Sequence, residues 1–160
     1  MGTKAKVKDI LYFMEIRKLT EDDLIELRAL YKQFWNEESS IEKMKIKFKK
    51  LKERKDYIFL SAIKDNKLVG SALGIICEDL YGDCNSFMVV EDVIVDKKYR
   101  RIGIGTNLMK ELEKIALKNS CNYIILITDT KRIIAQKFYT SLGYNPDSHK
   151  GFKKYFNKIS

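Results

Sequence analysis

The chain has 160 residues, of which 45% are hydrophobic and 33% are charged. This length is sufficient for one domain whose core needs no disulfide or metal to hold it together, so we expect a single domain over residues 1–160. The longest apolar runs are too short to span a membrane. One proline and eight glycines exclude a low-complexity array.

The charge balance raises the question of a nucleic-acid partner. Thirty-one Lys and Arg against 22 Asp and Glu give a formal net charge of +9, which is compatible with binding a polyanion. The lysines between residues 43 and 55, however, lie on an amphipathic pattern and have no interleaved aromatic residues for base stacking. We therefore favour a solvated helix face over a nucleic-acid site.

Cysteine and histidine usage argues against a metal site. Cys77, Cys84 and Cys121 form an odd set without Cys-x-x-Cys spacing, and His149 is the only histidine. Free thiols are favoured, and no metal is predicted. The first nine residues precede no sustained apolar stretch, so we expect a cytoplasmic protein with no membrane partner.

The N-terminal part begins with a strand over residues 14–19 and a helix over residues 20–34. Thr20 is the expected cap of that helix, with Asp23 at the capping-box position. A polar loop led by the only tryptophan, Trp35, separates this helix from a second one over residues 41–54.

The rest of the chain alternates strand and helix patterns. An Asp65-Asn66 turn joins the first two of these strands as a hairpin. Gly143 is the expected left-handed cap of the last helix. The predicted strands are residues 57–64, 67–77, 87–95, 123–128 and 151–159, and the predicted helices are one opening behind Gly103 and one containing Tyr139.

Residues 100–106, Arg-Arg-Ile-Gly-Ile-Gly-Thr, join a buried strand to a strongly amphipathic helix. Gly103 and Gly105 would let main-chain N–H groups approach a phosphate, and the helix dipole favours the negative charge. Arg100 and Arg101 add fixed cations. A P-loop would need a Lys-Ser/Thr pair, and a Rossmann turn would need a small residue where this chain has Leu108, so both are excluded.

Glu91 and Asp92 are adjacent acids inside an otherwise apolar strand, where burial of a charge is costly. Neighbouring strand residues point to opposite faces unless a bulge re-aims them, so at most one of the pair is expected to face a cleft. A structural pair, bonded to a loop and to a lysine, is the alternative interpretation.

The glycine loop resembles the acyl-CoA signature of the GNAT superfamily of N-acetyltransferases, Gln/Arg-x-x-Gly-x-Gly/Ala, through Arg100, Gly103 and Gly105. A second segment resembles the superfamily's last helix, Asn-x-x-Ala-x-x-Phe-Tyr-x-x-x-Gly-Phe/Tyr. Its matching residues are Ala135, Phe138, Tyr139, Gly143 and Tyr144, whereas Arg132 stands in the usual Asn position. Over residues 14–159 the resemblance implies an α+β (mixed α/β) fold with a central mixed, mostly antiparallel twisted sheet of six to seven strands flanked by about four helices.

The resemblance also implies an enzyme, an acyltransferase that moves the acetyl group of acetyl-CoA to a primary amine by direct attack in a ternary complex. Glu91 is ranked first as the base, acting through water, with Asp92 as the other candidate, and Tyr139 is the implied acid. Trp35, Glu37 and Glu38 are the implied acceptor contacts. The implied cofactor contacts are Val93, Ile94, Val95, Arg100, Arg101, Ile102, Gly103, Ile104, Gly105, Thr106, Arg132, Ala135 and Phe138.

Several alternatives stay open. The acceptor is a small-molecule amine or a lysine-type amine, and a homodimer is an open assembly because dimers are frequent in the superfamily. The Trp35 loop could be an exposed loop with a buried aromatic anchor, and Tyr139 could pack like Phe138. A non-catalytic acyl-CoA-binding module, suggested by Arg132, and a basic nucleic-acid-binding domain are the competing functions.

Overall fold

The computed structural model describes residues 14–156. The chain forms two compact units, one running through Ile125 and the other beginning at Leu126. The single-domain organisation expected from the length stays a prediction. None of the helices within residues 14–156 is long and apolar enough to cross a membrane.

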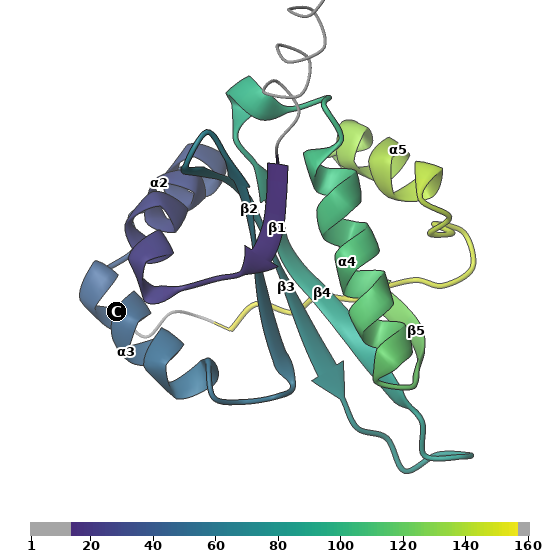
Figure 1. Ribbon diagram of the computed structural model, residues 1–160. Coiled ribbons are helices and arrows are strands. Elements are labelled where there is room, and N and C mark those ends of the chain that lie inside the picture. Colours follow the sequence, from purple (N-terminus) through teal and green to yellow (C-terminus); the bar gives the residue numbers. More distant parts are fainter. Residues whose placement is uncertain (1–13, 157–160) are drawn as a thin grey trace, which may run out of the picture. The chain divides into compact units, whose positions relative to one another are not determined.

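The first unit is built on a five-stranded sheet with strand order β1-β2-β3-β4-β5 (Figure 1). The strands are β1 (Met14–Lys18), β2 (Tyr57–Lys64), β3 (Lys67–Cys77), β4 (Ser86–Val95) and β5 (Cys121–Leu126), the last of which reaches the boundary of the unit. The helices are α2 (Leu24–Trp35), α3 (Ile41–Leu51) and α4 (Ile104–Lys118), with short 3-10 turns η1 (Glu21–Asp23) and η2 (Lys97–Tyr99). The second unit contains α5 (Ile133–Ser141).

The predicted mixed α/β architecture is confirmed, with fewer strands than expected. Residues 14–156 contain five strands instead of six to seven. The final strand predicted over residues 151–159 does not form in its described part, residues 151–156, and the remainder lies outside the described residues. The aromatic side chains Phe152, Tyr155 and Phe156 are 80–89% exposed, so this segment buries too little apolar surface to stabilise a strand.

Strands β1 to β4 pair antiparallel in sequence order, and β4 connects to β5 through α4, which gives a mixed sheet. The β2–β3 hairpin turns at Asp65 and Asn66, whose φ angles are 52° and 59°. Positive φ at both central residues is typical of the two-residue hairpin turn that matches strand twist. The predicted hairpin is confirmed.

Helices cover both faces of the sheet in the first unit: α2 and α3 one face, α4 the other (Figure 1). Two glycines in β3 let α4 approach closely, since a Cβ on Gly74 would lie 2.9 Å from Leu112. The buried residues of α4 are Ile104, Leu108, Met109, Leu112 and Ala116. The core under α2 and α3 consists of Leu19, Leu24, Leu27, Leu30, Phe48, Leu68 and Ile94.

Strand β4 contains a β-bulge at the acidic pair. Leu73 pairs with Glu91 and Ser71 pairs with Ile94, so two steps along β3 correspond to three along β4. Asp92 lies inside the bulge with a left-handed backbone, φ 53°, a conformation that Asp tolerates better than most residues. The bulge leaves the extra residue unpaired and re-aims the strand.

The bulge changes which face β4 presents to each helix layer. Met88 lies against Gly74 on the side of α4, whereas Ile94 belongs to the core under α2. Side chains an even number of residues apart would share a face in a regular strand. The bulge between them therefore places the acidic pair where the strand passes from one core to the other.

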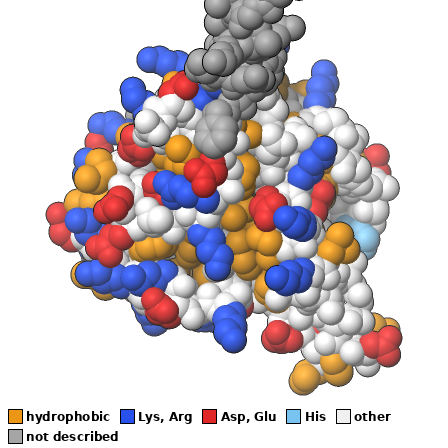
Figure 2. Space-filling model, viewed as in Figure 1, with side chains coloured by type: hydrophobic (Ala, Val, Ile, Leu, Met, Phe, Trp, Pro, Cys, Tyr) orange, Lys and Arg blue, Asp and Glu red, His pale blue; other side chains and the backbone are white. Residues whose placement is uncertain are grey.

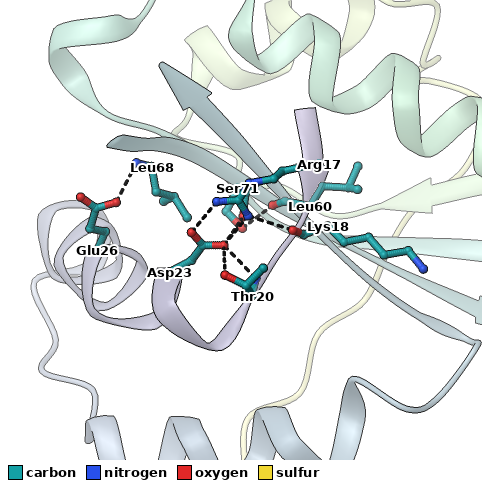
Figure 3. Close-up of polar contacts among 9 residues, drawn as sticks. Arg17, Lys18, Thr20, Asp23, Glu26, Leu60, Leu68 and Ser71 are labelled. Carbon is teal, nitrogen blue, oxygen red and sulfur yellow. Dashed lines mark hydrogen bonds and ion pairs between the residues drawn. The ribbon is translucent and has the colours of Figure 1, made fainter. Parts of the chain in front are cut away.

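A buried carboxylate fastens the start of α2 to the sheet (Figure 3). Asp23 accepts hydrogen bonds from the Arg17 guanidinium at 2.6 and 2.8 Å, from the Thr20 N–H and hydroxyl at 2.8 and 3.0 Å, and from the Ser61 hydroxyl at 3.3 Å. Burial alone would raise the pKa of Asp23, but the hydrogen bonds from Arg17 and Thr20 and the charge of Arg17 lower it below its ordinary value. The predicted capping box between Thr20 and Asp23 is confirmed.

Two further contacts fix α2 along its length. The Glu26 carboxylate accepts the N–H of Leu68 at 2.8 Å, at the start of β3. The Gln33 side-chain oxygen accepts the N–H of Lys97 at 3.0 Å, just beyond β4. The last turn of α2 is thereby held at a defined place beside the end of β4.

Candidate functional site

A cavity of about 340 Å³ lies beside the C-terminal end of α2. Its lining residues come from the last turns of the helix, the following loop and the β4 bulge: Tyr31, Trp35, Glu37, Ser39 and Asp92. The lining therefore combines two carboxylates with two aromatic rings and a hydroxyl. This composition suits a small ligand that is both polar and cationic.

The loop that carries Glu37 is anchored at both ends. Asn36 ends α2 in a left-handed conformation, φ 57°, and donates its N–H to the Lys32 carbonyl at 2.9 Å. Lys32 also forms an ion pair with Glu38, and the Ser40 side chain caps α3. The rim of the cavity is thus fixed by helix ends on both sides.

The aromatic rings of the cavity are held by one another. The Trp35 ring centroid lies 5.2 Å from Tyr31 and 4.8 Å from Phe34, with interplanar angles of 58° and 67°. Burial, and then the negative charge of Asp92, raise the pKa of the Tyr31 hydroxyl above its ordinary value. Tyr31 therefore stays protonated at working pH, and the Asp92 carboxylate is close enough to act on it electrostatically.

The structure separates the two acids that the sequence placed side by side. Asp92 is half-buried and lines the cavity, whereas Glu91 is exposed and is not part of the lining. Of the three acceptor contacts implied by the sequence, Trp35 and Glu37 line the cavity and Glu38 does not.

Two lining residues were absent from the sequence prediction. Tyr31 lies four residues before Trp35, so the two share a helix face, and that spacing could have revealed it. For Ser39 the sequence carries no comparable signal.

The glycine loop has a left-handed backbone at two of its residues. Arg101 and Gly103 have φ angles of 63° and 88°. A Cβ on Gly103 would meet nothing within 4 Å, so glycine is favoured there by the backbone conformation and leaves an open approach. The Arg100 guanidinium donates to the Val95 carbonyl at 3.0 Å, which ties the loop to the end of β4.

Helix α4 begins at Ile104 with Gly103 as its N-cap, and no side chain of the described residues caps it. The N–H groups of its first turn, including those of Gly105 and Thr106, therefore lack a side-chain acceptor in the described part of the chain. The Ile102 side chain is exposed, whereas those of Ile104 and Ile94 are buried in the core. The last two could contact a ligand only through their main chains.

The second unit holds the remaining residues that the sequence singled out. Tyr139 is half-buried, with ring centroids of Phe138 at 5.1 Å and Tyr144 at 6.1 Å. Gly143 has φ 93°, which confirms the predicted left-handed residue after the helix. Arg132 is exposed at the N-cap of α5.

Ala135 and Phe138 of α5, which the sequence implies as cofactor contacts, are both half-buried. In residues 14–156 there is no group of three or more His, Cys, Asp or Glu side chains that could hold a metal ion. Cys77, Cys84 and Cys121 are free thiols.

Comparison with known proteins identifies the family. Residues 24–144 match the family model described as the acetyltransferase (GNAT) family. Because this match covers most of the chain, the protein belongs to the GNAT family.

The curated relatives match only in part. The chain is 38% identical over 65 residues to N-alpha-acetyltransferase 30 of Homo sapiens, which is 41% of this chain and 18% of that protein. It is 33% identical over 87 residues to an uncharacterized N-acetyltransferase of Methanocaldococcus jannaschii, which is 54% of this chain and 51% of that protein. The chain thus spans between about a fifth and half of the length of these relatives.

Solved structures match over nearly the whole chain. A transcriptional regulator from Bacillus halodurans has a TM-score of 0.82 and 26% identity, covering 90% of this chain and 100% of that one. Glucosamine-6-phosphate N-acetyltransferase from Arabidopsis thaliana has a TM-score of 0.80 and 21% identity, covering 91% and 99%. The similarity to the Arabidopsis enzyme shows that the two proteins share a fold.

Proposed function

We propose that the protein is an N-acetyltransferase that moves the acetyl group of acetyl-CoA to a primary amine. Acetyl-CoA supplies the acetyl group as a thioester. The amine nitrogen attacks the carbonyl carbon in a ternary complex and loses a proton, while the carbon–sulfur bond breaks and the sulfur leaves as a thiol. The observation that carries the proposal is an acid-lined cavity next to the β4 bulge in a chain of the GNAT family.

The glycine loop fits the diphosphate of coenzyme A. The first turn of α4 offers N–H groups without a side-chain cap in the described residues, and Arg100 and Arg101 add positive charge. The bulge leaves β4 with one residue more than β3 can pair, at Asp92 and Val93. We assign the Val93 N–H to polarise the thioester carbonyl, and Ile94 and Val95 to hold the acyl arm through their main chains.

We propose Asp92 as the base, in place of the Glu91 ranked first from sequence. An alkyl ammonium has a pKa of about 10.4, so a proton must leave before or during attack at neutral pH. Asp92 lines the cavity and acts on Tyr31, whereas the exposed Glu91 does neither. Glu91 remains the second candidate and would have to act through water.

Tyr139 is proposed as the acid that protonates the departing thiolate. Its support is the register of the last-helix motif, in which Ala135, Phe138 and Tyr139 match the family pattern. The same resemblance supports Arg132, Ala135 and Phe138 as contacts of the cofactor.

The direct test measures thiol release from acetyl-CoA across a panel of amines. We expect Asp92→Asn to lower kcat by about a hundred- to ten-thousandfold while the affinity for coenzyme A is retained. Glu91→Gln should change kcat only a few-fold. Tyr139→Phe should also lower kcat without weakening cofactor binding. Full loss in Glu91→Gln with an active Asp92→Asn would reverse the assignment of the base.

A non-catalytic acyl-CoA-binding module is the second candidate, because Arg132 replaces the Asn of the family motif. Tight cofactor binding without thiol release for any amine would favour it.

A nucleic-acid-binding role is less well supported, since Figure 2 shows Lys and Arg side chains intermixed with Asp and Glu on the face drawn. Free thiols at Cys77, Cys84 and Cys121 support a reducing, cytoplasmic location, and a homodimer remains part of the proposal.

A further inference from the structure

We propose that the acceptor is a linear diamine or polyamine, in which one amine is acetylated beside Asp92 while a second ammonium group is held by Glu37 and Trp35. This inference rests on the proposed function, because it assigns the cavity beside α2 to the acceptor. It goes further by naming the chemical class of the acceptor and the group that selects it.

The first argument is charge. Among residues 14–156, the cavity is lined by the carboxylates of Glu37 and Asp92 and by no Lys or Arg. Glu37 has no ion pair within residues 14–156, whereas its neighbour Glu38 is paired with Lys32. With a monoamine beside Asp92, the Glu37 carboxylate would gain no counter-charge. An acceptor with a second cationic group supplies one.

The second argument is the aromatic wall. Trp35 is 43% exposed although it belongs to a packed helix turn. Its ring is oriented by Tyr31 and Phe34 and so is already placed before a ligand arrives. An ammonium group over the face of a tryptophan is attracted by the ring quadrupole, and the methylene chain of a diamine can lie along the same apolar surface.

The third argument is rigidity of the rim. The left-handed Asn36 and the cap at Ser40 fix the loop that bears Glu37. The β4 bulge fixes Asp92 on the opposite side. Two carboxylates held on separate, anchored elements select acceptors by the distance between the acceptor's two ammonium groups. A single flexible acid could not do so.

Turnover provides the first test. With acetyl-CoA at a fixed saturating concentration, kcat/KM is compared for 1,4-diaminobutane, spermidine, n-butylamine and a short peptide with a free α-amino group. We expect the diamine and the triamine to exceed n-butylamine by at least about tenfold, the value of one charge-assisted contact. Glu37→Gln should raise their KM about tenfold with little change in kcat, and so remove most of their advantage over n-butylamine. Glu53→Gln, which changes an exposed acid just beyond α3 that does not line the cavity, is the matched control.

Intrinsic fluorescence provides a test of acceptor binding that does not depend on acetyl transfer. Trp35 is the only tryptophan of the chain, so emission reports directly on this cavity. We expect 1,4-diaminobutane to change the emission at concentrations about tenfold below those needed for n-butylamine, and Glu37→Gln to abolish that difference.

The two tests separate the inference from the function on which it rests. Equal or better turnover of n-butylamine or the peptide would overturn the diamine assignment and leave the acetyltransferase intact. Absence of turnover for every amine, with Glu37-dependent diamine binding still seen by fluorescence, would overturn the proposed function and keep the cation site. No preference in either assay refutes the inference.

Discussion

The buried carboxylate of Asp23 provides the sharpest test of how the first unit is held together. Asp23→Asn preserves the shape of the side chain but removes its charge and replaces one acceptor oxygen with an NH₂ group that faces donors. Arg17, whose side chain is 31% exposed, loses its partner. Breaking a fully buried pair costs about 3–5 kcal/mol. Because Arg17 can recover some hydration, we expect the free energy of unfolding to fall by about 2–3 kcal/mol at pH 7.

The pH dependence has a definite sign. The pKa of Asp23 is lowered in the folded state, so its contribution is fully present above its ordinary pKa in the unfolded chain and is lost as the pH falls through the folded value. The difference in unfolding free energy between wild type and Asp23→Asn should therefore be constant from pH 7 to pH 5 and shrink below about pH 4.

The measurement is urea unfolding at pH 7 and again below pH 4, with equal m-values as the condition for comparing midpoints. Asp22→Asn is the matched control, because Asp22 is the exposed neighbour in the same 3-10 turn and should change stability by less than about 0.5 kcal/mol. Equal losses in the two variants, or a difference that persists undiminished in acid, would refute the account of this network.

Three further substitutions test the backbone of the site. Gly103→Ala should lower the unfolding free energy by about 1–2 kcal/mol through its left-handed backbone and weaken coenzyme A affinity in calorimetry. Gly82→Ala, with φ 61° and open surroundings, is the control and should lower stability alone. Equal coenzyme A affinities in the two variants would contradict the phosphate cradle. Gly70→Ala should lower the unfolding free energy by about 1–3 kcal/mol, because the new Cβ would lie 3.1 Å from the carbonyl oxygen of Ile94; thermal unfolding checks this, and an unchanged melting temperature would show that the backbone yields. Asn36→Ala should raise the acceptor KM and Asn36→Gly should not, since only alanine strains the left-handed cap; steady-state kinetics in which both variants behave like wild type would show that this cap does not position the loop.

Much of the fold was predictable because its signals are local. The Asp65-Asn66 turn, the Thr20–Asp23 capping box and the alternation of β2 and β3 each depend on a few neighbouring residues, and each was confirmed. The strand expected over residues 151–159 followed the order of elements typical of the family and had no local turn or cap behind it. In its described part the chain does not supply the burial that a strand needs.

The site was less predictable because it depends on pairing between strands. The sequence showed that Glu91 and Asp92 were unusual, but the position of the bulge is set by the register between β3 and β4, which no local pattern encodes. The inclusion of Tyr31 in the cavity likewise follows from how α2 is fastened at Glu26 and Gln33. These are contacts between residues far apart in the chain.

The bulge in β4 has a consequence for how this protein can evolve. One strand serves two hydrophobic layers, and the crossover between them falls on the residue that bears the acid. Deleting a single residue there would turn the side chains of Val93 to Val95 to the opposite face of the sheet. The acid therefore cannot shift along the strand without rebuilding both layers at once.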